Sequence, residues 1–194
     1  MKRKILTWCC SLLLAISLAS AASADAPTGW AIAGNNPAAY DFGTDSSVVA
    51  SGSRRSAYIK AKASAVSGFG VLMQTIAADN YQGSRLRLSA LLRTGNANRA
   101  QMWMRVDGAD RKVLAFDNMD ARPVSGTTDW QRYEIVLDVP KDSVDIAFGF
   151  FLMGGGSVWA DQFQMDQVGD SIPTTAAMQA PPKSRSPVNL DFSQ

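Results

Sequence analysis

The stretch "AQMWMRVDGADRKVLAFDNM", residues 100–119, decides the fold class because its first half alternates. One side of an extended strand carries Met102, Met104 and Val106. The other side carries Gln101, Trp103 and Arg105. A period of two residues is typical of a half-buried antiparallel strand. The segment "DGAD" at 107–110 supplies turn residues, so the stretch predicts two strands joined as a hairpin.

The same period recurs along most of the chain. Alternating runs occur at 56–63, 85–92, 130–139, 143–153 and 156–168, with Gly, Asp, Asn and Pro between them. We find no stretch with a convincing helical period. Many short alternating runs separated by turn residues predict an all-β domain, either a sandwich or a barrel.

The N-terminal segment has the three parts of a secretory signal peptide. Lys2, Arg3 and Lys4 are positive, residues 5–19 are apolar, and Ala22-Ser23-Ala24 is a small-residue cleavage site. The apolar run is short for a membrane span. We therefore expect cleavage near Ala24, a secreted or periplasmic mature protein, and no stable membrane insertion of the mature chain.

Cleavage would change the composition of the chain. The full 194 residues carry 19 basic and 17 acidic side chains, no His and two Cys, and both cysteines lie in the cleaved segment. The mature chain would hold 16 basic against 17 acidic residues. This balance argues against a nucleic-acid partner, which a basic face would attract. About 170 residues suffice for one domain, which we place at residues 25–168.

The end of the chain changes in character after Val168. Residues 169–187 are rich in Pro, Ser, Thr and Ala, and they are typical of a linker. Residues 188–194, "VNLDFSQ", resume the alternation. We hypothesise that this segment adds a β-strand to its own domain or to a neighbouring molecule; the alternative is a disordered tail.

Three segments carry a family resemblance. "YQGSRLRLSALLRT" (81–94), "TTDWQRYEIVLDVPKDS" (127–143) and "GSVWADQFQM" (156–165) resemble, in the same order, segments of bacterial carbohydrate-binding-module-like jelly rolls of the galactose-binding-domain-like superfamily. The resemblance covers about residues 30–168. It implies a single antiparallel β-sandwich (jelly roll).

The last of these segments also bears on a metal site and on the core. Several members of the family bind a structural calcium near two adjacent acids, whereas this chain has Asp161 followed by Gln162. We therefore expect no metal, and a structural role for the Asp161 carboxylate. Simple alternation places Trp159 beside Phe163 and Met165, so we also expect Trp159 to lie in the core.

The residue types argue against an enzyme. The mature chain would lack His and Cys, and with them Ser-His-Asp and Cys-His nucleophilic catalysis and the usual zinc ligands. Glu134 is the only glutamate and falls on an apparently exposed strand face. We expect a non-catalytic protein without a cofactor.

Binding is the function that the sequence favours. Saccharide sites stack flat aromatic rings on sugars and flank them with polar side chains. One strand face carries this combination, with Trp103, Arg105 and Gln101. Arg93 and Tyr58 would be neighbours of these residues if their strands belong to the same sheet. We predict carbohydrate binding in an outer-sheet groove. The alternative is an envelope accessory or scaffold protein that binds a protein partner through the same face.

The signal-peptide hypothesis gives a first test. The mature protein should begin at Asp25, because peptidase cleavage follows the Ala-Ser-Ala site. Mass spectrometry of the extracytoplasmic fraction would read this N-terminus. Recovery of the chain there with Met1 still attached would contradict the hypothesis.

Overall fold

The computed structural model describes residues 26–175, and they form an antiparallel β-structure. Two 3-10 turns are the only helical elements in this part of the chain, η1 (Pro37–Ala39) and η2 (Ala109–Arg111). The strands are β1 (Ala31–Gly34), β2 (Tyr40–Asp45), β3 (Ser56–Ala61), β4 (Phe69–Ala77), β5 (Arg85–Gly108), β6 (Val113–Asp117), β7 (Val124–Asp138), β8 (Ser143–Met153) and β9 (Ser157–Val168).

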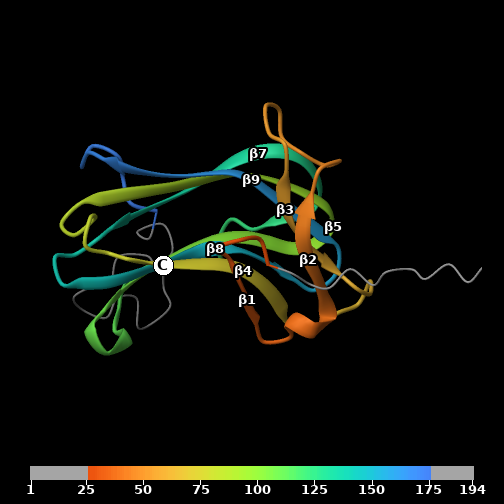
Figure 1. Cartoon of the computed structure of the whole chain (residues 1–194), viewed down its shortest axis with the longest axis horizontal. Coiled ribbons are helices and arrows are strands. Elements are labelled where there is room, and N and C mark those ends of the chain that lie inside the picture. Colours follow the sequence, from red (N-terminus) through yellow and green to blue (C-terminus); the bar gives the residue numbers. More distant parts are fainter. Residues whose placement is uncertain (1–25, 176–194) are drawn as a thin grey trace, which may run out of the picture.

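Strand β5 belongs to both layers of a sandwich (Figure 1). Its N-terminal half pairs with β7 and β9, and β9 continues to β3 and β2. Its C-terminal half pairs with β8 and β6, and β8 continues to β4 and β1. We call the layer with β8 the first sheet and the layer with β9 the second sheet. The predicted single antiparallel β-sandwich is confirmed, with jelly-roll architecture.

Strand β5 crosses between the layers where its backbone bends. Its register with β9 ends at Gly95, and its register with β8 begins at Arg99. Between them Asn96 has a φ of 48°, a left-handed conformation that Asn tolerates better than most residues. The two alternating runs seen in the sequence are therefore one strand of 24 residues.

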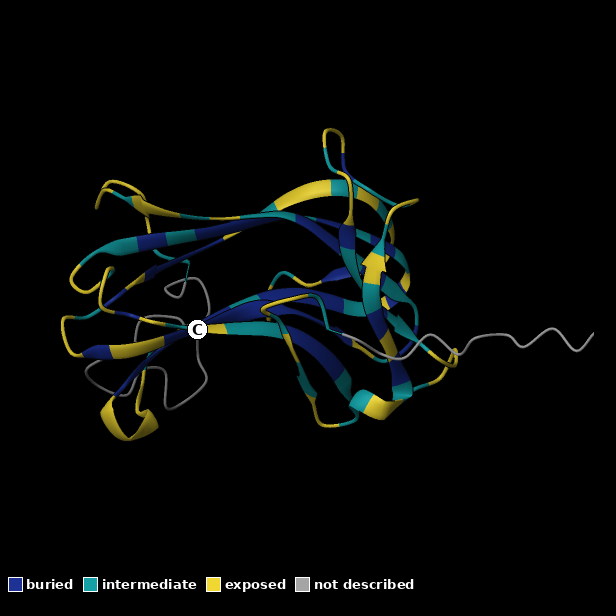
Figure 2. Cartoon of the chain, in the orientation of Figure 1, coloured by how far each residue is buried: buried dark blue, intermediate teal, exposed yellow. Residues whose placement is uncertain are grey.

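The core lies between the two sheets, where Figure 2 shows the dark blue buried segments. Met102, Met104 and Val106 are fully buried, as their alternation predicts. The second sheet contributes fully or almost fully buried residues, which include Leu86, Leu88, Leu92, Ile135 and Leu137. Burial of so many apolar side chains supplies the main driving force for folding.

A β-bulge in β9 changes which side chains face the core. The register against β5 shifts between Ser89 and Leu91, and Gln162 has a φ of 52°. A bulge inserts one residue and reverses the alternation beyond it. Phe163 and Met165 consequently pack against the core.

The same bulge corrects the prediction for Trp159. This side chain lies on the outer face of the second sheet, so the expectation that Trp159 is a core residue is wrong. Asp161, at the bulge, has the expected structural role. It accepts hydrogen bonds from the Ala50 backbone N–H (3.0 Å) and the Ser53 hydroxyl (2.9 Å), which fixes the loop between β2 and β3.

Some predicted segments lie outside the described residues. These are the signal peptide at 1–24, most of the linker and the C-terminal segment at 188–194. The start of the linker packs on the domain, where Arg85 donates to the carbonyls of Asp170 (2.9 Å) and Ile172 (2.7 Å). Residues 26–175 contain no helix of the length and apolar character that a membrane span requires.

Close approach of two backbones makes Gly149 in β8 a sensitive position. A methyl group added there would lie 2.1 Å from the carbonyl oxygen of Leu72 in β4. We expect Gly149→Ala to lower the free energy of unfolding by about 1–3 kcal/mol, the usual cost of overpacking. Urea unfolding monitored by circular dichroism would measure this.

The matched control is Gly169→Ala, where the nearest atom to the added methyl is 3.9 Å away. This variant should unfold like the wild type. Equal free energies of unfolding for the two glycine variants would contradict the prediction, because β4 and β8 would then accommodate a methyl group at Gly149 without loss of stability.

Candidate functional site

The outer face of the first sheet carries an open groove of about 530 Å³. It is lined by residues from β1, β4, β8, β5 and β6 and from the loops next to them, mostly apolar: Ala33, Gly34, Asn35, Phe69, Val71, Met73, Trp103, Arg105, Phe116, Asn118, Phe151 and Met153. Several large apolar side chains thus line a hollow that opens to solvent.

Strand register explains why the face is hollow. Trp103 lies directly opposite Gly149 on β8, and Gly149 lies opposite Met73 on β4. In the next row Arg105 lies opposite Ala147. Because β8 presents only small residues beside the indole and the guanidinium, these two long side chains have free space next to them.

Trp103 offers its carbon atoms to a ligand. The ring is half-buried, and its buried indole N–H has no hydrogen-bond acceptor among residues 26–175. A molecule in the groove therefore meets the apolar part of the indole. This suits stacking or apolar contact more than hydrogen bonding.

Arg105 is the charged group of the groove. Its Nε and Nη2 lie 2.9 and 2.8 Å from the same oxygen of Asp107, and its side chain is 40 % exposed. Asp107 fixes one edge of the guanidinium and partly neutralises its charge. The remaining N–H groups are in position to donate to hydroxyl or carbonyl oxygens.

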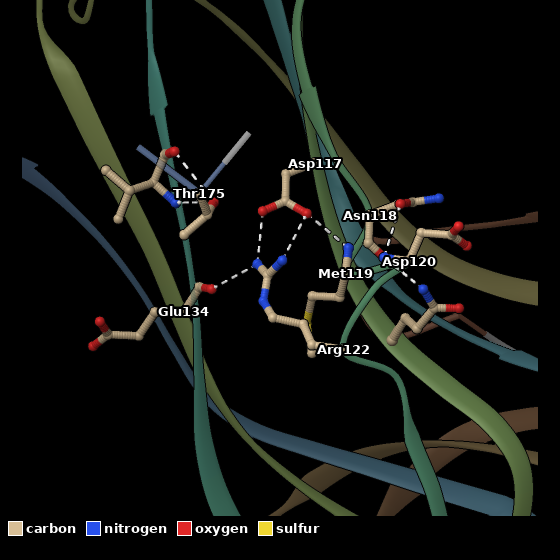
Figure 3. Close-up of polar contacts among 9 residues, drawn as sticks. Asp117, Asn118, Met119, Asp120, Arg122, Glu134 and Thr175 are labelled. Carbon is tan, nitrogen blue, oxygen red and sulfur yellow. Dashed lines mark hydrogen bonds and ion pairs between the residues drawn. The ribbon is translucent and has the colours of Figure 1, made fainter. Parts of the chain in front are cut away.

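The loop at 117–123 forms one rim of the groove, which Asn118 helps to line. Figure 3 shows the polar contacts that hold this loop. Arg122 makes a two-pronged contact with the buried Asp117 carboxylate, with distances of 2.6 and 3.3 Å. Asp117 also accepts from the Met119 backbone N–H at 2.7 Å. These contacts hold Met119 at a φ of 57° and fix where Asn118 lies.

Hydrogen bonds keep the Asp117 carboxyl ionised. Burial alone would raise its pKa, but donors on Arg122, on Thr175 and on the Met119 backbone outweigh burial. The pKa of Asp117 therefore lies below its ordinary value. The rim loop depends on a charged carboxylate in a buried position.

Gln101 supports the rim and does not line the groove. It is only 1 % exposed, although it lies on the same strand face as Trp103. Its amide donates to the Asn118 carbonyl at 2.6 Å and accepts from Arg99 at 2.7 Å. The structure thus gives Gln101 a positioning role, where the sequence suggested a ligand contact.

Tyr58 and Arg93 do not join this groove either. Both lie on the outer face of the second sheet, where Tyr58 and Arg93 each pair with Trp159 in register. The condition for their proximity to Trp103, a shared sheet, is not met. Trp103 and Arg105 are the two predicted residues that the structure brings together.

Sequence reasoning missed most of the groove's apolar lining. Phe69 and Phe151 contact each other with ring centroids 5.9 Å apart, and Phe116 and Met153 lie in the same groove. Phe151 was overlooked because it follows the core residue Phe150 in an almost continuous apolar run. Such a run on a strand indicates that both faces are apolar, which was the available signal.

Among residues 26–175, no three His, Cys, Asp or Glu side chains are grouped in a way that could hold a metal ion. The groove offers apolar contact, aromatic stacking surface, and hydrogen-bond donors on Arg105 and Asn118.

Comparison of the sequence with known proteins gives one informative relative. No protein-family model matches the chain. A Bacillus subtilis (strain 168) protein named uncharacterized HTH-type transcriptional regulator YbfP is 42 % identical over 168 residues. These residues are 86 % of this chain and 57 % of that protein, so the chain spans little more than half of the relative's length.

Comparison of the structure identifies the fold. The C-terminal family 22 carbohydrate-binding module of Clostridium thermocellum Xyn10B matches with a TM-score of 0.52 and 12 % identity, over 75 % of this chain and 89 % of that one. The Stig cyclase Fisc of Fischerella sp. TAU matches with a TM-score of 0.54 and 16 % identity, over 75 % and 88 %. The neighbours are mostly carbohydrate-binding modules, and the chain has their β-jelly-roll fold.

The Asp117–Arg122 pair gives a prediction about pH. Because the folded pKa of Asp117 is below the unfolded value of about 3.9, its ionised form stabilises the protein above that pH. This contribution is lost as the pH falls through the folded pKa. Asp117→Asn should lower the free energy of unfolding at pH 7 by about 2–3 kcal/mol, the value of hydrogen bonds to charged groups.

The stability difference between wild type and Asp117→Asn should shrink as the pH falls below about 4, because the unfolded carboxyl takes up a proton there while the folded carboxyl stays ionised down to its lower pKa. Chemical unfolding at pH 7, 5, 4 and 3 measures it, with the exposed Asp142→Asn as the matched control. A difference that stays constant across this range would contradict the role of the Asp117 charge.

Proposed function

We propose that the chain is a non-catalytic binding module that holds a carbohydrate in the groove on the first sheet. The observation that carries this is the groove itself, an open hollow with Trp103 and Arg105 beside the small residues of β8. A pyranose ring has apolar C–H faces and a rim of hydroxyls. Trp103, Phe69 and Phe151 suit the first, and Arg105 and Asn118 suit the second.

Carbohydrate-binding modules of the same fold support the proposal that the chain binds a saccharide. The family 22 module of Xyn10B was studied for the part that conserved cleft residues play in ligand binding. A family 61 module was solved in complex with β-1,4-galactotriose. We extend carbohydrate binding to this chain because its groove combines stacking surface with hydrogen-bond donors.

A protein partner is the second candidate, and the apolar lining of the groove favours it. Phe116 and Met153 are 40 % and 39 % exposed, and both line the groove. Contiguous apolar surface of this kind often marks a protein interface. The envelope accessory role predicted from the sequence would use the same face.

Export remains part of the proposal, on the strength of the N-terminal sequence. The name of the Bacillus relative refers to a helix-turn-helix regulator. The regular elements of residues 26–175 are strands and two 3-10 turns, so the described part of this chain corresponds to something other than a DNA-binding helix pair. We propose that this part is the ligand-binding segment.

The test is titration of the purified protein with a panel of soluble oligosaccharides, followed by tryptophan fluorescence and calorimetry. Trp103→Ala should weaken binding by about tenfold or more, since it removes the stacking surface. It should also lower the melting temperature modestly, because the ring is half-buried. Arg105→Ala should weaken binding by a smaller factor and change stability less.

Val113→Ala is the matched control, since Val113 is 52 % exposed on β6 and does not line the groove. Unchanged saccharide affinity in Trp103→Ala would refute the groove as the saccharide site. A purified envelope partner that is lost with Trp103→Ala and is not displaced by saccharides would favour the second candidate.

A further inference from the structure

The outer face of the second sheet carries a pair of aromatic rings that the groove does not use. Tyr58 on β3 and Trp159 on β9 lie directly opposite each other in register. The face is on the other side of the sandwich from the groove, since β3 and β9 belong to the second sheet. Both side chains are half-buried and reach the surface.

Glycines make room for both rings. A methyl group added to Gly43 on β2 would lie 2.9–3.0 Å from three atoms of the Tyr58 side chain. One added to Gly95 on β5 would lie 3.5 Å from the Trp159 ring. The Tyr58 ring therefore lies over Gly43, and the Trp159 ring lies beside Gly95. Together the two rings form an aromatic surface that extends across β2, β3, β9 and β5.

Asp45 fixes the orientation of the indole. Its Oδ2 accepts the Trp159 N–H at 3.0 Å, and its Oδ1 accepts from the backbone N–H and hydroxyl of Ser47 and the N–H of Val48. The Ser47 hydroxyl is the main cause of an Asp45 pKa far below its usual range, so the carboxylate stays charged. A Trp ring held in this way is preorganised for contact.

Charged side chains of both signs surround the rings. The Lys60 ammonium lies 4.3 Å from the centre of the Tyr58 ring, 5.1 Å from that of Trp159, and 3.5 Å from Asp45. Arg93, next to Trp159 in register, lies 4.0 Å from Asp129. The surface thus offers donors and acceptors with little net charge.

We propose that Tyr58 and Trp159 form a second carbohydrate-binding surface, which takes a neutral saccharide chain by stacking and donates to its hydroxyls from Lys60 and Arg93. The balance of nearby charges matches an uncharged, hydroxyl-rich ligand better than a polyanion. Since its side chain is 37 % exposed, Lys60 can leave the ring faces for solvent or a hydroxyl at small cost.

Two saccharide surfaces on opposite faces would make the domain bivalent. A polysaccharide carries many identical sugar units, so one molecule of the protein could engage two chains or two segments of one chain. Avidity then follows from effective concentration, without any new contact. The second surface does not rest on the groove, and either could exist alone.

The experiment is affinity electrophoresis of the full chain in gels that contain xylan, galactan or a mixed β-glucan. The proteins compared are wild type, Trp103→Ala, Trp159→Ala and the double variant. The control is Glu134→Gln. Glu134 is an exposed residue on β7 and lies opposite Ser89 of β5 in the second sheet. We expect at least one polysaccharide to retard Trp103→Ala measurably. In the double variant, the affinity for that polysaccharide should be about tenfold weaker than in Trp103→Ala.

Tyr58→Ala and Trp159→Phe guard against loss of folding in Trp159→Ala, with thermal melting followed by circular dichroism. Tyr58→Ala should weaken retardation in the Trp103→Ala background, and Trp159→Phe should keep part of it. The proposal is overturned if Trp103→Ala is not retarded by any polysaccharide, or if folded Tyr58 and Trp159 variants match Glu134→Gln. Unchanged binding in Trp103→Ala alone refutes the groove and leaves the second surface standing.

Discussion

The passage of β5 through both sheets is the constraint on which the rest of the structure depends. One strand of 24 residues pairs with β7 and β9 and then with β8 and β6, and it bends at Asn96 between the two sets. Because every sheet must place one face on the core, the inward set of β5 fixes the outward set as well. Trp103 reaches the groove for the same reason that Met102 and Met104 reach the core.

Alternation made much of the fold predictable, and a bulge set the limit. Most inward residues of β5, β7 and β8 follow from period two, which predicts an all-β sandwich or barrel. The family resemblance pointed to the sandwich, and the turn residues at 107–110 to the hairpin after Gly108. At Asp161 one inserted residue reversed the faces, so Trp159 moved from the expected core to the surface. Bulges leave little trace in a single sequence, since the residue that bulges is chosen by packing and turn geometry.

The candidate site was predictable only in part, for a related physical reason. Trp103 and Arg105 were identified because they share a strand, and spacing along a strand can be read directly. Tyr58 and Arg93 required knowledge of which strands are neighbours, which depends on long-range pairing. Gln101 shares a strand with Trp103, yet the rim loop covers it, and the burial of an outward-facing residue cannot be seen from alternation alone.

The two outer faces of the sandwich differ in what they ask of a ligand. A ligand in the groove would cover mostly apolar side chains. Its affinity would come from this contact area and from hydrogen bonds to Arg105, whose guanidinium Asp107 holds in place. The Tyr58–Trp159 surface has the Lys60 ammonium beside its rings, and the Asp45 carboxylate accepts the Trp159 N–H. The buried Asp117–Arg122 pair holds the rim of the groove, and the Asp45 hydrogen bond holds the Trp159 indole of the second surface. A ligand that binds both faces must therefore present an apolar side and a hydroxyl-rich edge, which a chain of pyranose rings does at every repeat.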